Sequence, residues 1–240
     1  MTVGEGEGRL PRPEVVVLDV NETLSDMRPM ADRFAEVGAP GHLAATWFAS
    51  VLRDGFALAA AGTSAPFAQI AREMLRQQLA AADLELDRDL DAAADHVLDG
   101  FGQLDVHPDV VPGLTALDEL GVRLVTLTNG ATSVAEGLLE RAGARDRIER
   151  FMSVDEAGLW KPAPASYHYA LEQCGVTASE AMLVAVHPWD VDGARRAGLR
   201  AAWVRRAGRG DAPSPSYPGH FEAPELTVES LVELADRMRD

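Results

Sequence analysis

The sequence has 240 residues, of which 47% are hydrophobic, and a formal net charge of −16. This length allows one large domain with a buried core, and the negative charge argues against nucleic acids and anionic membranes, since both bind basic surfaces. The single cysteine, Cys174, cannot form an internal disulfide, and no apolar stretch reaches the length of a membrane span. We therefore expect a cytoplasmic protein that acts on a small anionic molecule, which local cations would have to bind.

The chain begins with thirteen acidic, glycine-rich residues, for which we expect a disordered leader. Apolar and mostly β-branched residues at 15–18 then predict a buried strand, which ends at Asp19. The carboxyl ends of strands in a parallel sheet are where ligands bind, so Asp19 is a candidate nucleophile. The alternative is that its side chain caps the next turn.

A long segment without a convincing strand follows, and its apolar residues recur every three or four positions, as in amphipathic helices. Three breaks divide it into about four helices, at 38–41, 61–66 and 83–89. We interpret 27–101 as a helical insert, with 14–26 and 102–240 forming the core.

Strands and helices alternate in the rest of the chain, which predicts a doubly wound parallel sheet of the α/β class. The expected strands are 122–130, a short one from 151, 180–190 and 200–206. The expected helices are a turn and helix over 106–121, one reaching about residue 142, then 164–174, 190–199 and 226–238, with a loop at 207–220.

Polar residues end three of the expected strands, and the carboxyl ends of parallel strands meet at one edge of a sheet. The pairs are Asp19 with Thr23, Thr128 with Asn129, and His187 with Asp190. Lys161, the only lysine in the chain, lies on the loop between the second and third pairs. Its compact ammonium would pair with a substrate anion and keep Asp19 ionised. The set suits a displacement reaction at a centre that carries negative charge.

Four short segments resemble the motifs of the haloacid dehalogenase superfamily, in the same order. They are DVNETL at 19–24, LTNG at 127–130, KPAP at 161–164 and HPWD at 187–190. The helical insert matches that superfamily's cap domain in its position after the first motif. The resemblance implies a Rossmann-like catalytic core with an inserted helical cap.

Within the superfamily, the details resemble the 2-haloacid dehalogenase (type II) branch. Asn21 stands where phosphatases carry an acid, and Ala185 and Val186 stand where they hold magnesium. The lysine, proline and tyrosine of the dehalogenases are matched by Lys161, Pro162 and Tyr167, and their tryptophan and aspartate by Trp189 and Asp190. The resemblance implies a metal-independent hydrolase without a cofactor, which cleaves the carbon–halide bond of a small 2-haloacid.

The resemblance also implies roles for individual residues. Asp19 would attack the substrate carbon and form an ester, and water positioned by Asp190 with His187 or Lys161 would hydrolyse that ester. Four residues would hold the substrate carboxylate and fix Asp19, namely Thr23, Thr128, Asn129 and Lys161. Tyr167 would support Lys161 or the pocket wall. The remaining substrate-binding candidates are Asn21, Phe48 and Trp189.

One departure from the dehalogenase pattern concerns the departing halide. Phe48 stands where the branch carries an arginine, and Arg53 lies more than one helical turn further on. Phe48 is either part of an apolar lid over the pocket or a packing residue. For Trp47 and Phe56, packing within the helical insert is the favoured interpretation.

His187 is the second departure, since it stands where the branch has an asparagine that places the hydrolytic water. It is either a general base with a pKa near neutrality or a buried histidine that orients Asp190. Two alternative functions stay open: a magnesium-dependent phosphatase acting on a small phosphomonoester, and a catalytically weak protein that binds a metabolite or a partner. The sequence also leaves a homodimer open.

Overall fold

The computed structural model describes residues 12–81, 84–206 and 216–239. Within them, parallel strands form one six-stranded sheet in the order β3-β2-β1-β4-β5-β6. The strands are β1 (Val15–Leu18), β2 (Arg123–Thr128), β3 (Arg150–Ser153), β4 (Ala181–Ala185), β5 (Arg200–Val204) and β6 (Leu226–Val228). The predicted doubly wound α/β fold is confirmed, and the first strand lies at the centre of the sheet.

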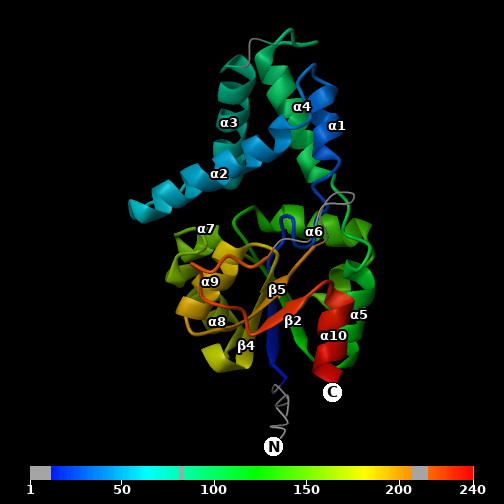
Figure 1. Cartoon of the computed structure of the whole chain (residues 1–240), viewed down its shortest axis with the longest axis vertical. Coiled ribbons are helices and arrows are strands. Elements are labelled where there is room, and N and C mark those ends of the chain that lie inside the picture. Colours follow the sequence, from blue (N-terminus) through cyan, green and yellow to red (C-terminus); the bar gives the residue numbers. More distant parts are fainter. Residues whose placement is uncertain (1–11, 82–83, 207–215, 240) are drawn as a thin grey trace, which may run out of the picture.

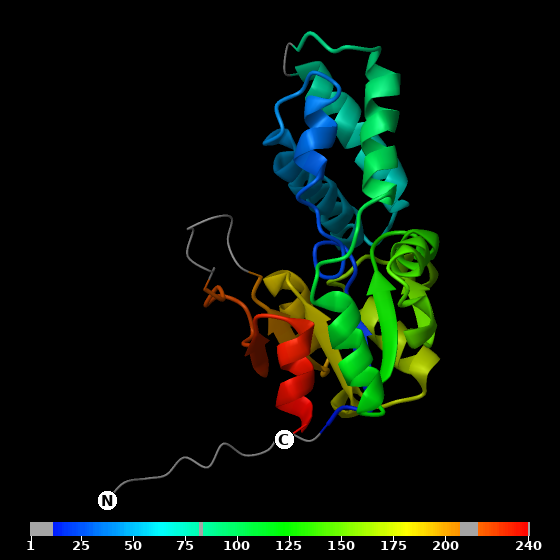
Figure 2. The same ribbon diagram turned by 90° about the vertical axis from the view of Figure 1, so that its right-hand side faces the viewer.

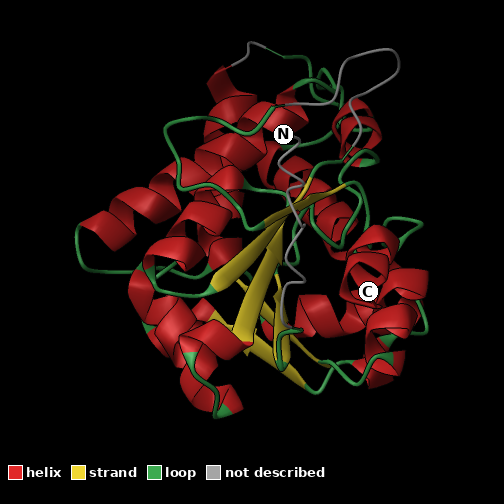
Figure 3. Ribbon diagram, turned by 60° about the horizontal axis from the view of Figure 1, so that its bottom comes forward, coloured by secondary structure: helices red, strands yellow, loops and turns green. Residues whose placement is uncertain are grey.

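Helices cover both faces of this sheet (Figure 3). Alternate residues of β1 point to opposite faces, and both faces are apolar because both are covered. Val16 and Leu18 belong to one apolar cluster, with residues of α5 (Val110–Glu119), α6 (Thr132–Arg141) and α10 (Leu231–Arg239). Val15 and Val17 belong to the other, with residues of α8 (Pro164–Cys174) and α9 (Pro188–Arg196). This packing fixes the end of β1, where Asp19 follows.

The described part of the segment expected to be helical contains four helices, α1 (Met30–Ala35), α2 (Leu43–Ala60), α3 (Phe67–Ala81) and α4 (Leu90–Gly102). They lie together beyond the end of the sheet that β1 reaches at Asp19 (Figures 1 and 2). Trp47 is fully buried among them, and its Nε1 donates to the Ala71 carbonyl at 2.9 Å, as a packing residue should. Phe56 instead reaches out to Trp189 of α9, with ring centroids 4.8 Å apart, and so joins the helical insert to the core.

The C-terminal segment differs from expectation. A single helix over 226–238 was expected, but residues 226–228 form the edge strand β6 and the helix begins at Leu231. The strand alternates buried Leu226, exposed Thr227 and buried Val228, and three residues are too few to reveal this period in the sequence. The short strand expected from 151 ends at Ser153, whose hydroxyl caps the first turn of the short helix α7 (Val154–Ala157).

Two expectations fall largely on residues outside the described ranges, namely the disordered leader and the loop at 207–220. Among the described helices, none combines the length and the apolar character needed to cross a bilayer.

Candidate active site

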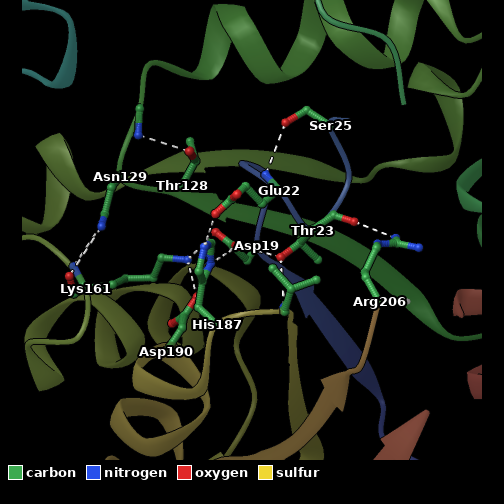
Figure 4. A network of polar contacts seen from close by, with 12 residues as sticks. Asp19, Glu22, Thr23, Ser25, Thr128, Asn129, Lys161, His187, Asp190 and Arg206 are labelled. Carbon is green, nitrogen blue, oxygen red and sulfur yellow. Dashed lines mark hydrogen bonds and ion pairs between the residues drawn. The ribbon is translucent and has the colours of Figure 1, made fainter. Parts of the chain in front are cut away.

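The polar residues that follow the strands gather around Asp19, the first residue after β1 (Figure 4). Its side chain is buried, and its Oδ1 accepts a hydrogen bond from Lys161 Nζ at 2.9 Å. Its Oδ2 accepts one from Thr23 Oγ1 at 2.5 Å and lies 3.2 Å from His187 Nδ1. The Thr23 hydroxyl in turn accepts the Val186 backbone N–H at 3.1 Å, so its own proton is directed at Asp19.

Lys161 is fully buried and links two carboxylates, because its Nζ also lies 2.6 Å from Asp190 Oδ2. Asn129 holds the lysine backbone from both sides: its Oδ1 accepts the Lys161 N–H at 2.9 Å, and its Nδ2 donates to the Lys161 carbonyl at 3.3 Å. The amide of Asn129 is therefore engaged in positioning Lys161, whereas the sequence suggested direct contact with substrate.

Asp190 lies in the first turn of α9, and Tyr167 of α8 donates to its Oδ1 at 2.6 Å. Helices α8 and α9 come close here because Gly193 has no side chain. A Cβ at Gly193 would lie 2.6 Å from Tyr167 Oη and 2.6 Å from Pro162 Cβ. Tyr167 was expected to support Lys161 or the pocket wall, and its contact with the lysine runs through Asp190.

Burial and the neighbouring charges shift the pKa values of the two aspartates in opposite directions. Burial raises the pKa of Asp19, but the charge of Lys161 and the hydrogen bonds from His187 and Thr23 outweigh it and hold this pKa well below its usual range. Burial also raises the pKa of Asp190, and the negative charge of Asp19 opposes the lowering effect of Lys161, so this pKa stays raised. Asp19 is thus the more acidic carboxyl and Asp190 the more basic carboxylate.

The structure brings His187 to Asp19. Its Nδ1 lies 3.2 Å from Asp19 Oδ2 and its Nε2 lies 2.9 Å from Glu22 Oε2, so both ring nitrogens contact carboxylates other than that of Asp190. Burial lowers the pKa of His187, but the hydrogen bonds to the two carboxylates outweigh burial and raise it to about 9. A pKa raised in this way favours the protonated ring, in which both nitrogens donate hydrogen bonds.

Glu22 is a contact of this site that sequence reasoning missed. It lies within the first motif, yet nothing in the letters shows that its carboxylate turns toward His187. The signal is conformational: Glu22 has a φ of 62°, the only positive value for a non-glycine residue among those described.

A cavity of about 170 Å³ lies between the helical insert and the core, and Val20 and Asn21, the two residues after Asp19, are part of its lining. Its core side includes Asn21, Thr128 and Gly130, and its other side includes Phe67, Leu98 and Phe101 of the insert. Of the predicted substrate contacts, Asn21 and Thr128 line this cavity. Phe48 and Trp189 do not appear in its lining; both stack on His187 instead, with ring centroids 6.4 Å and 4.9 Å away.

The side-chain oxygens around Asp19 do not fit the ligand set of a magnesium ion. Each side-chain oxygen of Asp19 and Asp190 already accepts a hydrogen bond from Lys161, Thr23 or Tyr167. Ala185 and Val186 add no side-chain oxygen, whereas Mg²⁺ requires octahedral oxygen ligation. Among the described residues, no group of three or more histidine, cysteine, aspartate or glutamate side chains is arranged to hold a metal ion.

The chain combines a Rossmann-like sheet with an inserted group of helices. A buried aspartate–lysine–aspartate cluster lies at the carboxyl ends of the strands. Hydrolases of the haloacid dehalogenase type have this arrangement. A family model described as haloacid dehalogenase-like hydrolase matches residues 13–198, and the chain belongs to this family.

Several named relatives are dehalogenases that match most of the chain, whereas a phosphoserine phosphatase of Thermus thermophilus matches 54% of it, at 34% identity. The chain is 27% identical to haloacetate dehalogenase H-2 of Moraxella sp. (strain B), over 81% of this chain and 87% of that protein. It is 31% identical to the (S)-2-haloacid dehalogenase of Xanthobacter autotrophicus, over 80% of this chain and 75% of that protein. The solved structure of the L-2-haloacid dehalogenase from Xanthobacter autotrophicus superposes with a TM-score of 0.83 at 28% identity, covering 95% of this chain and 98% of that one. A second structure of that enzyme carries covalently bound chloropropionic acid. The resemblance to this branch is confirmed.

Proposed function

We propose that this hydrolase cleaves the carbon–halide bond of a small 2-haloacid through an ester on Asp19, without a metal ion. The observation that carries the proposal is the contact between the buried Asp19 carboxylate and Lys161, whose charge lowers the pKa of Asp19 and keeps it ionised. Covalent attachment of chloropropionic acid in a structural relative supports an ester of this kind.

The first step uses the Asp19 oxygen that has fewer hydrogen bonds. Among the described residues, Oδ1 accepts one hydrogen bond, from Lys161, while Oδ2 contacts both Thr23 and His187. A lone pair of Oδ1 is therefore free to attack the substrate α-carbon. The new oxygen–carbon bond forms as the carbon–halogen bond breaks, and the halide leaves with the electron pair.

The second step hydrolyses the ester. Water attacks the carboxyl carbon of the Asp19 ester. The 2-hydroxyacid leaves with Oδ1, the oxygen that attacked the substrate carbon in the first step, and the oxygen of the water stays in Asp19. One water proton ends on the hydroxyl group of the product, and the other is released. We assign the positioning of this water to Asp190 and Lys161, because the raised pKa of Asp190 suits it to accept a proton.

The cavity supports a short acid as substrate. Asn21 and Thr128 offer polar groups on its core side, and the apolar residues of α3 and α4 close its other side. We propose that the helical insert acts as a cap that keeps bulk water away from the reacting carbon. Haloacetate and short 2-haloacids, the compounds in the names of the relatives, are the substrates to test.

The test is an assay of halide release from chloroacetate and (S)-2-chloropropionate, with and without EDTA. A parallel assay follows phosphate release from p-nitrophenyl phosphate with Mg²⁺. We expect halide release that survives EDTA and disappears in Asp19→Asn. Phosphate release that requires Mg²⁺, without halide release, would establish the phosphatase alternative. No release of either product, with Asp19→Asn retaining the biological role, would indicate a binding protein.

Location and assembly belong to the same proposal. The lone Cys174 is buried and unpaired with another cysteine, which fits a reducing compartment, and we propose the cytoplasm. Light scattering on the purified chain distinguishes a monomer from a homodimer.

A further inference from the structure

Both ring nitrogens of His187 contact carboxylates, and two aromatic rings stack against the imidazole. Nδ1 lies 3.2 Å from Asp19 Oδ2, and Nε2 lies 2.9 Å from Glu22 Oε2. The rings of Phe48 and Trp189 stack against it, with interplanar angles of 29° and 27°. Ionised carboxylates only accept hydrogen bonds, so both ring nitrogens carry a proton. The Trp189 ring, with its centroid 4.9 Å from that of His187, also favours a cation.

Glu22 is held in a conformation that suits this contact. Its φ of 62° is uncommon for a residue with a side chain. The Glu22 N–H donates to Ser25 Oγ at 3.2 Å, and the Glu22 carbonyl accepts from His107 Nε2 at 3.1 Å. Uncommon backbone conformations that the surroundings fix in this way cluster at functional sites. Here the conformation directs a carboxylate at His187, as the dashed lines in Figure 4 show.

The two donors that reach Asp19 Oδ2 coincide with the place where charge develops during ester hydrolysis. If Oδ1 becomes the ester oxygen, Oδ2 becomes the carbonyl oxygen, and attack by water on the carboxyl carbon places a negative charge on Oδ2. Thr23 Oγ1 and His187 Nδ1 already lie at 2.5 Å and 3.2 Å from this atom. Donors arranged in advance around such an oxygen lower the barrier for tetrahedral intermediates.

We propose that His187 and Thr23 form the oxyanion hole for hydrolysis of the Asp19 ester, and that Glu22 is the positioning residue that keeps His187 a cation. The inference rests on the proposed function, since it concerns the second step of that reaction. His187 does not gain or lose a proton in this role; it donates a hydrogen bond that strengthens as Oδ2 becomes negative.

The charges facing His187 come from a small set of groups. Asp19 follows β1, Glu22 lies in the loop after it, and Lys161 lies across Asp19 on its other oxygen. Helix α2 contributes the uncharged ring of Phe48, and α9 contributes the ring of Trp189 and the carboxyl of Asp190, which is paired with Lys161. Ester formation removes the charge of Asp19, so in the intermediate Glu22 is the remaining anion in contact with the imidazolium. Its importance should therefore be greatest in the second step.

The test separates the two steps by rapid quench with (S)-2-chloropropionate. Halide release reports ester formation, and intact-protein mass spectrometry reports the Asp19 ester. His187→Phe keeps an aromatic ring but has no N–H, and Glu22→Gln keeps the shape but loses the charge. Glu36→Gln is the matched control, because the Glu36 carboxylate contacts the His96 ring, at 2.7 Å, and Arg33, both on the helical insert.

In His187→Phe we expect one halide per site to be released at a near-normal rate, followed by an ester that is hydrolysed about 10²-fold more slowly. Glu22→Gln should also accumulate the ester. In both the wild type and Glu22→Gln, ester hydrolysis should slow as the pH rises and His187 loses its proton. The decline should begin at a lower pH in Glu22→Gln, because the imidazolium has lost its stabilising anion. Glu36→Gln should match the wild type in both steps.

Two outcomes would overturn the inference while the proposed function stands. One is an equal slowing of halide release and ester hydrolysis in both variants, with no accumulated ester. The other is a hydrolysis rate that rises as His187 loses its proton, which would make the neutral ring a base. A wild-type enzyme that releases no halide and forms no ester would overturn the proposed function and this inference together. Circular dichroism of each variant verifies its fold, and Glu22→Gln tests the role of His187 even if His187→Phe does not fold.

Discussion

Lys161 Nζ lies 2.9 Å from Asp19 Oδ1, and the lysine side chain is completely buried. Burial lowers the pKa of Lys161, but the charges of Asp19 and Asp190 outweigh burial and raise it. Removing the lysine charge would leave two buried carboxylates without the cation that they share, which is costly in the interior. The active site and the stability of the core thus depend on the same lysine.

Lys161→Arg should lose most activity while retaining charge. The planar guanidinium is larger than an ammonium and cannot contact both carboxylates from the same buried position, so we expect a loss of about 10²-fold or more in kcat/KM. Lys161→Met should also destabilise the fold by roughly 3–5 kcal/mol. Urea unfolding and halide release measure the two effects. Arg53→Lys, an exchange at an exposed ion pair with Asp54, is the control, and near-normal kinetics in Lys161→Arg would refute the role of the lysine.

Gly193→Ala should disturb Tyr167. The new Cβ would lie 2.6 Å from Tyr167 Oη and from Pro162, so α8 and α9 must separate and the hydrogen bond to Asp190 must lengthen. We expect a loss of about 1–3 kcal/mol in the free energy of unfolding, together with reduced activity. Gly137→Ala in α6 is the matched control: its Cβ would meet only the end of the flexible Arg141 side chain, at 3.3 Å. That substitution should stabilise the helix by about 0.5–1 kcal/mol. Equal effects of the two substitutions would contradict the close approach of the helices.

Phe48→Arg tests the missing halide arginine. From the sequence alone, this change should raise the rate on short 2-haloacids. The structure predicts otherwise, because Phe48 is 4% exposed and stacks on His187, which is itself a cation. We expect a loss of roughly 3–5 kcal/mol in stability, the cost of an unpaired buried charge, and no gain in halide release. Phe48→Leu should cost less than about 1.5 kcal/mol. A stable Phe48→Arg variant with faster chloride release would show that the position faces the substrate.

His187 should make stability depend on pH. Its folded-state pKa of about 9 lies above the ordinary value of 6.5, so its contribution is fully present below about pH 6.5 and is lost as the pH rises through about 9. The contribution is at most roughly 3 kcal/mol. Urea unfolding of the wild type and His187→Phe across this window measures it. The stability advantage of the wild type should shrink as the pH rises, and an advantage that grows would contradict a protonated ring.

The gathering of polar residues at one edge of the sheet could be predicted from the sequence. Asp19 and Thr128 each follow a run of apolar residues long enough to define a buried strand, and parallel strands bring their carboxyl ends together. Lys161 could be predicted at the same site because it lies between two of these strand ends in the sequence and is the only lysine in the chain. These inferences depend on periodicity and order along the chain, which the sequence shows directly.

The direction of individual side chains could not be predicted. His187 turns to Glu22 because of the backbone conformation at Glu22, which no residue type reveals. Tyr167 reaches Asp190 because α8 and α9 approach at Gly193, and that approach depends on packing between distant segments. Asn129 lies in the expected motif, yet both ends of its amide are engaged by the backbone of Lys161.

The most direct test of the aspartyl ester is a single turnover of a 2-haloacid in ¹⁸O-labelled water, followed by mass spectrometry of the peptide that contains Asp19. If water attacks the carboxyl carbon of the ester, one labelled oxygen remains in Asp19 and the hydroxyl group of the first product molecule is unlabelled. If water displaces the halide directly, the label appears in the product and Asp19 stays unlabelled. The first result is the one that the geometry around Asp19 predicts, and the second would contradict it.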